Sequence, residues 1–116
     1  MVSVLLLFNL PLKEDADEHR RWLTDSSLET ALSQHFIPAL KQVPGLKGLE
    51  VSRSLGGPEG VKRYDRAIRL LFDDEASMRA AVASPETRKV VAMAMGHLRI
   101  HDISITFFED RTVEPQ

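Results

Sequence analysis

The chain opens with a short, almost wholly apolar run, residues 2–8, which predicts a β-strand at the centre of a sheet. A run without polar alternation is typical of a strand buried on both faces, so both sides of the sheet should be covered. Asn9-Leu10-Pro11 ends the run. The mostly charged residues 13–21 that follow predict a short exposed helix or loop.

A helical pattern follows, beginning at Ser26-Ser27-Leu28-Glu29, which matches a capping box, and ending near Pro44-Gly45. Pro38 lies inside this stretch and removes a backbone donor, so we expect a kink or a helix break just before it. The bend falls beside His35. Apolar or aromatic positions at helical spacing form a stripe with this histidine: Leu28, Leu32, His35, Phe36, Ala39, Leu40 and Val43.

Two alternating segments, residues 46–55 and 64–72, predict strands with one apolar face each. The glycine-rich turn at 56–60 joins them into an antiparallel hairpin. Asp73-Asp74-Glu75 then places acidic residues at the first turn of a helix that runs to about residue 83. Ser84-Pro85 restarts the helix with a cap residue and a first-position proline, and Gly96 ends it.

The last strand is expected at residues 100–108, followed by a polar tail. The resulting order is strand, helix, hairpin, helix, strand, which predicts one α+β domain over residues 1–116. Its fold should be a ferredoxin-like β-α-β-β-α-β sandwich with a four-stranded antiparallel sheet and both helices on one face. A second copy of the same sheet would cover the other face, so we expect a homodimer, a dimeric α+β barrel.

The composition limits the kinds of partner and cofactor that the chain is expected to bind. The 116 residues are 43% hydrophobic and 28% charged with a net charge of -2, which excludes a strongly basic surface for nucleic acid or an anionic membrane. The chain has no cysteine, which excludes disulfides and thiolate metal sites and suits the cytoplasm. Residues 2–8 lack the features of a signal peptide and are too short for a membrane span. No phosphate-binding or dinucleotide motif occurs, so we expect no cofactor.

Several segments, taken in order, resemble the EthD family of dimeric α+β barrel proteins. They are His35-Phe36-Ile37-Pro38, Val43-Pro44-Gly45-Leu46, Glu50-Val51-Ser52-Arg53, Gly56-Gly57-Pro58, Leu71-Phe72-Asp73, the stretch from Met78 through Ala83-Ser84-Pro85-Glu86, and Ile105-Thr106-Phe107-Phe108-Glu109. The resemblance implies a ferredoxin-like fold, dimerisation through the sheets, and a pocket for a small, mostly apolar organic molecule between sheet and helices. Similar proteins are associated with ether degradation or aromatic polyketide processing.

The chain departs from the family pattern at two places. Residues 93–97 replace an expected Asn-Phe, and the segment between Asp15 and His35 is longer than usual, with no role assigned to residues 15–25. Both places could border the pocket, so the substrates of the family do not predict the substrate of this chain.

His35 is the candidate catalytic residue, because an imidazole on the inward stripe can act as general acid or base near neutral pH. The alternative is a core histidine bonded to neighbouring backbone. Tyr64 and Arg66 share one face of their strand and Arg69 the other, and an exposed or dimer-rim role is expected for the arginines. The candidate ligand-binding residues are Trp22, Phe36, Tyr64, Met93 and His97.

No metal site is predicted, because the four-residue spacing of His97 and His101 is interrupted by the end of the helix. The sequence therefore predicts an EthD-like homodimer that binds a small apolar or aromatic molecule. It would be a cofactor-independent enzyme of catabolism or polyketide-type biosynthesis, with His35 as acid or base. The alternatives are a non-catalytic ligand-binding or accessory dimer, and a dimer whose pocket is filled by its own side chains.

Overall fold

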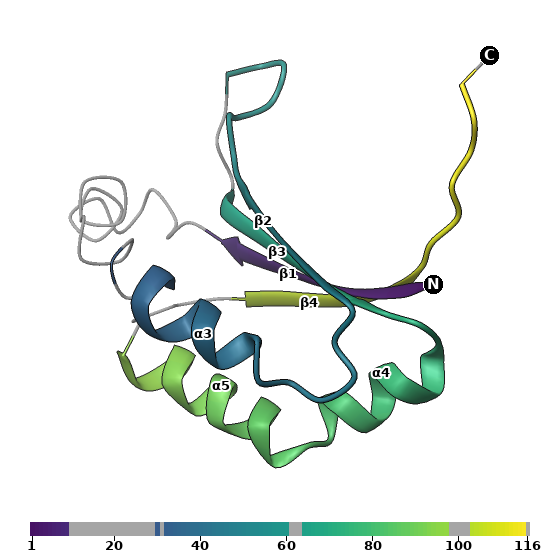
Figure 1. The fold of residues 1–116 in the computed structure, drawn as a ribbon. Coiled ribbons are helices and arrows are strands. Elements are labelled where there is room, and N and C mark those ends of the chain that lie inside the picture. The colour runs from purple at the N-terminus through teal and green to yellow at the C-terminus, as the bar shows by residue number, and fades with distance from the viewer. Residues whose placement is uncertain (10–29, 31, 61–63, 98–102, 116) are drawn as a thin grey trace.

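A computed structural model describes residues 1–9, 30, 32–60, 64–97 and 103–115. Four antiparallel strands form one sheet in the order β2-β3-β1-β4, with β1 in the interior as predicted (Figure 1). The elements in chain order are β1 (Val2–Asn9), the π-helical turn η1 (Leu32–Phe36), α3 (Ile37–Leu40), β2 (Gly48–Arg53), β3 (Tyr64–Phe72), α4 (Glu75–Val82), α5 (Pro85–His97) and β4 (Ile103–Glu109).

The predicted ferredoxin-like α+β fold is confirmed, and β3 has the bounds that its alternation predicts. β2 is shorter than predicted, because the chain leaves the sheet after Arg53 and enters the turn closed by the Gly60 N–H donating to the Gly57 carbonyl at 3.0 Å. Three predicted features lie outside the described residues: the exposed segment at 13–21, the capping box at 26–29 and the start of the last strand at 100.

The bend expected near Pro38 takes the form of a change of helix type. The π-helical turn η1 ends at Phe36, and α3 begins at Ile37 with Pro38 in its first turn. Phe36 itself has helical φ and ψ, so the chain stays helical across the junction, and the change of helix type falls beside the proline, which has no N–H to donate. The chain then turns at Gly45, whose φ of 78° is a conformation that favours glycine.

Two caps start the helices that follow β3. Asp74 accepts a hydrogen bond from the Ser77 backbone N–H at 2.7 Å, and this bond is the main cause that lowers the pKa of its carboxyl. The Ser84 hydroxyl donates to the Ala81 carbonyl at 2.6 Å and accepts from the Thr87 N–H at 3.3 Å. The predicted restart of the helix at Ser84-Pro85 is confirmed.

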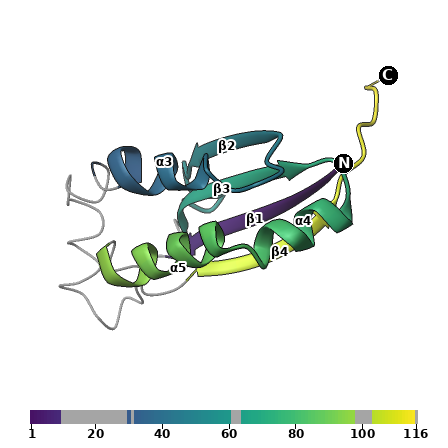
Figure 2. The ribbon, with the colours of Figure 1, turned by 60° about the horizontal axis from the view of Figure 1, so that its bottom comes forward.

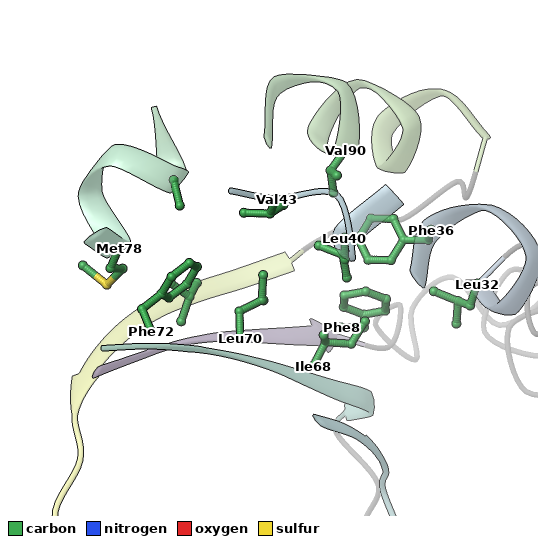
Figure 3. Close-up of a cluster of buried hydrophobic side chains, with 12 residues drawn as sticks. Phe8, Leu32, Phe36, Leu40, Val43, Ile68, Leu70, Phe72, Met78 and Val90 are labelled. Atoms are coloured by element: carbon green, nitrogen blue, oxygen red, sulfur yellow. The ribbon is translucent and has the colours of Figure 1, made fainter. Parts of the chain in front are cut away.

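All the described helices lie on one face of the sheet, as Figures 1 and 2 show. The core lies between this face and the helices (Figure 3), and its buried members are Val4, Phe8, Leu32, Phe36, Leu40, Val43, Ile68, Leu70, Phe72, Met78, Ala81 and Val90. The opposite face, called the open face below, carries no helix of the described residues. None of the described helices is long and apolar enough to cross a membrane.

Candidate functional site

One end of the sheet gathers the elements that carry the predicted site residues. The sheet register pairs Asn9, at the end of β1, with Tyr64, at the start of β3. On the helix side, the Phe36 ring of η1 meets the Phe8 ring of β1 edge to face, with centroids 5.8 Å apart. The last turns of α5 lie at the same end (Figures 1 and 2). We call this region the η1 end.

His35 does not point into the core. Its side chain is exposed, whereas Leu32 and Phe36 on either side of it are buried. The predicted stripe included both His35 and Phe36, as α-helical spacing allows. The π-helical turn is wider, so residues four apart fall in line along it, and Leu32, Phe36 and Leu40 form the inward row. The expected inward orientation of the imidazole is therefore wrong, while its chemical role stays a prediction.

Phe36 and Met93, two of the predicted ligand-binding residues, belong to the packed interior. Phe36 is 1% exposed and contacts Phe8, and Met93 is partly buried against the core cluster. A ligand can reach the Phe36 ring only if the helix layer moves away from the sheet. Met93 lies at the edge of that layer and is the more accessible of the two.

The other three predicted ligand-binding residues are placed in part or not at all. Trp22 lies outside the described residues. The backbones of Tyr64 and His97 are placed, at the start of β3 and the end of α5, and both are at the η1 end. Their side chains lie outside what the structure describes.

Arg66 also lies at the η1 end. From the sequence we expected it at an exposed or dimer-rim position. It is half-buried and lies on the helix-facing side of β3, in phase with Ile68, Leu70 and Phe72, and opposite Phe8 in the register. The alternation of the strand indicates this placement in the sequence, because Arg66 is in phase with the apolar positions that face inward. Arg53 of β2 is its direct neighbour in the sheet. The helix-facing surface thus changes from apolar to basic toward this end.

The chemistry available at the η1 end is acid–base chemistry with cationic groups near an apolar interior. His35 supplies an imidazole, a side chain that can act as general acid or base, and Arg53 and Arg66 supply positive charge. Among the described residues, no cluster of three or more His, Asp or Glu side chains is arranged to hold a metal ion.

No known family model matches the sequence, and none of the curated proteins does. Solved structures match it over nearly the whole chain. An EthD family protein from Bacillus halodurans is 20% identical, with a TM-score of 0.74, and the match covers 96% of this chain and 99% of that one. A dimeric ferredoxin-like protein of unknown function from Thermobifida fusca is 25% identical, with a TM-score of 0.54, over 92% of this chain and 88% of that one.

A third match is SnoaB from Streptomyces nogalater, described as a cofactor-independent oxygenase, whose structure is that of a mutant. It is 15% identical, with a TM-score of 0.61, and the match covers 99% of this chain and 97% of that one. At such identities the likeness concerns the fold, and the resemblance predicted from the sequence is confirmed at that level. The chain has the α+β ferredoxin-like fold of an EthD family protein and of related proteins that are described as dimeric.

Proposed function

We propose that this chain forms a homodimer that binds a small apolar or aromatic organic molecule at the η1 end, at the rim between its sheet and its helices. His35 acts there as general acid or base in a reaction that needs no cofactor. The observation that supports the proposal is that the elements carrying three of the predicted site residues lie at the same end of the sheet. His35, Tyr64 and His97 come from three elements far apart in the sequence, and all three elements meet at this end.

The physical setting supports acid–base chemistry at this end. His35 is exposed on the turn next to Phe36, so its imidazole can meet a ligand at the rim without opening the core. A histidine titrates near neutral pH and can both accept and donate a proton in one reaction cycle. SnoaB is described as a cofactor-independent oxygenase, and it shares this fold. The analogy is one of fold, and it supports the proposal only in that sense.

The homodimer is supported by the open face. Its central residues include Leu5 and Leu7 of β1, which remain partly exposed although they are apolar. Covering them with the same face of a second copy would remove this surface from water with two-fold symmetry. Proteins with this fold are described as dimeric. The absence of cysteine fits a reducing compartment, and we propose the cytoplasm.

A second candidate function is a non-catalytic ligand-binding or accessory dimer. The observation that favours it is the same exposure of His35. Catalysis needs at least two polar groups converging on one cavity, and within the described residues none is placed against this imidazole. In this alternative the η1 end binds the molecule and His35 does no chemistry.

The test combines ligand identification with site mapping. Native mass spectrometry of the purified protein identifies what co-purifies, and hydrogen exchange with and without that molecule locates it. Added protection over residues 32–40 and 85–97 is the expected result. Protection confined to the open face, or no bound molecule and no binding of a hydrophobic fluorophore such as anilinonaphthalene sulfonate, contradicts the proposal.

The role of His35 is tested with the compound so identified. His35→Ala should abolish turnover while binding is retained, whereas Gln34→Ala, a change at the exposed neighbour on the same turn, should leave turnover intact. Equal turnover in both variants rejects the catalytic role and selects the non-catalytic alternative.

A further inference from the structure

Among the described side chains of the open face, the charged ones form one cluster, and the others are apolar or small. Side-chain alternation and the register place Arg69 of β3 on this face, between Glu50 of β2 and Leu5 of β1. Leu71 and Phe108 lie in the next row of the sheet, on either side of Ser3. An arginine near the centre of such a face needs a partner if the face is to be covered.

The partner comes from the far edge of the sheet. Arg69 Nη2 donates to Asp110 Oδ1 at 2.7 Å, and its Nη1 lies 3.7 Å from Glu50 Oε2. Asp110 directly follows β4 and extends its ladder, because its backbone N–H donates to the Met1 carbonyl at 2.9 Å. The short bridge therefore crosses β1 on a diagonal, from β3 to the end of β4.

The residue beneath this diagonal is Ser3. It pairs with Leu71 on one side and Phe108 on the other, which places it under the middle of the line from Arg69 to Asp110. Ser3 is 0% exposed although no described helix covers this face. Its hydroxyl has no hydrogen-bond partner within the part of the chain that the structure describes. In the register, the line from Arg69 to Asp110 therefore passes over a buried position of β1.

We propose that the Arg69–Asp110 bridge adapts the open face for a second copy of this chain, by neutralising the central arginine within its own subunit before the face is covered. The inference rests on the homodimer proposed above. The occupant is a second copy because proteins with this fold are described as dimeric, and because the central cation of this largely apolar face already has its partners within its own subunit. Self-complementary faces of this kind meet their own copy across a two-fold axis.

The bridge then stabilises the dimer more than it stabilises the single subunit. In the single subunit the Arg69 and Asp110 side chains are 38% and 24% exposed, so water screens the pair and its contribution to folding is small. Once the face is covered, removing Arg69 leaves the Asp110 carboxylate buried without its cation, and removing Asp110 leaves Arg69 with only the longer 3.7 Å contact to Glu50. Either change costs more than the pair itself contributes.

The experiment measures dimer dissociation by analytical ultracentrifugation for the wild type and for Asp110→Asn, Arg69→Met and the double variant. Each single change should raise the dissociation constant about a hundredfold, and the double change should recover most of that loss. Glu75→Gln breaks a similar arginine–carboxylate pair, the 2.8 Å contact with Arg79 on α4, and should leave the dimer unchanged. Circular dichroism of each variant checks that the subunit remains folded.

Two results separate this inference from the homodimer proposal. A wild type that stays monomeric at all accessible concentrations overturns the homodimer, and the role of the bridge with it. A dimeric wild type whose Asp110→Asn and Arg69→Met variants dissociate no more readily than Glu75→Gln overturns the role of the bridge alone.

Discussion

The two faces of the sheet are built from the same strands and differ in what covers them. On the helix-facing side, Val4 and Phe8 of β1 are 5% and 0% exposed. On the open side of the same strand, Leu5 and Leu7 remain partly exposed. All four side chains are apolar, so residue type does not explain the difference in exposure. The difference arises because the described helices cover only one face of the sheet.

This contrast separates two kinds of stabilisation. The helix-covered face is completed within the chain, where the rings of Phe8 and Phe36 meet and the helices start from defined caps. The open face carries no helix of the described residues, and its central arginine is held by an ion pair with a residue 41 positions away. In the dimer proposed above, a second copy covers this face. Changes on the first face should act on folding, and changes on the second should act on association.

The largest difference is expected between the loss of a phenylalanine packed under the helices and the loss of one on the open face. Phe36→Ala should lower the free energy of unfolding by about 3–5 kcal/mol, because the ring is buried against Phe8 and leaves a cavity. Phe108→Ala, on the open face with 45% of the residue exposed, should cost less than about 1.5 kcal/mol. Urea denaturation at a concentration where the chain is monomeric measures both. Equal losses would show that the two faces do not differ as described.

A smaller effect is expected at the cap of α5. Ser84→Ala should lower the free energy of unfolding by about 1 kcal/mol, because it removes the acceptor for the Thr87 N–H and the donor to the Ala81 carbonyl. Ser52→Ala, at an exposed serine on the open side of β2, should change it by less than about 0.5 kcal/mol. The same denaturation assay compares them. A Ser84→Ala variant as stable as Ser52→Ala would exclude the cap as a source of stability.

The smallest effect concerns pH and Asp74. The hydrogen bond from the Ser77 N–H lowers the pKa of this carboxyl in the folded chain. The stability it confers is therefore complete above the pKa of the unfolded chain and is lost as the pH falls through the lower folded value. Asp74→Asn keeps a capping oxygen without the titration, so its urea midpoint should fall less between pH 6 and pH 3, approximately the range of carboxyl titration. Identical pH profiles for both proteins would contradict this account.

Much of the fold was predictable because its signals are local. β3 has the bounds that period-two alternation predicts, and the helix restart at Ser84 was visible as a cap residue followed by proline. The bend at Pro38 was predictable for the same reason, since a proline acts on the backbone next to it. The η1 end was predictable only in outline: Phe36 and Met93 lie there, but both belong to the interior rather than to an open lining.

The sequence by itself determined the bounds of β3, the restart of the helix at Ser84-Pro85 and the interior place of β1, because these follow from spacing and backbone chemistry along a few residues. Only the tertiary structure decided which side of the first helix faces inward, because the π-helical turn shifts the inward row to Phe36 and leaves His35 exposed. Only the tertiary structure decided that Arg69 would find Asp110, because the sheet register brings those distant residues within hydrogen-bond distance.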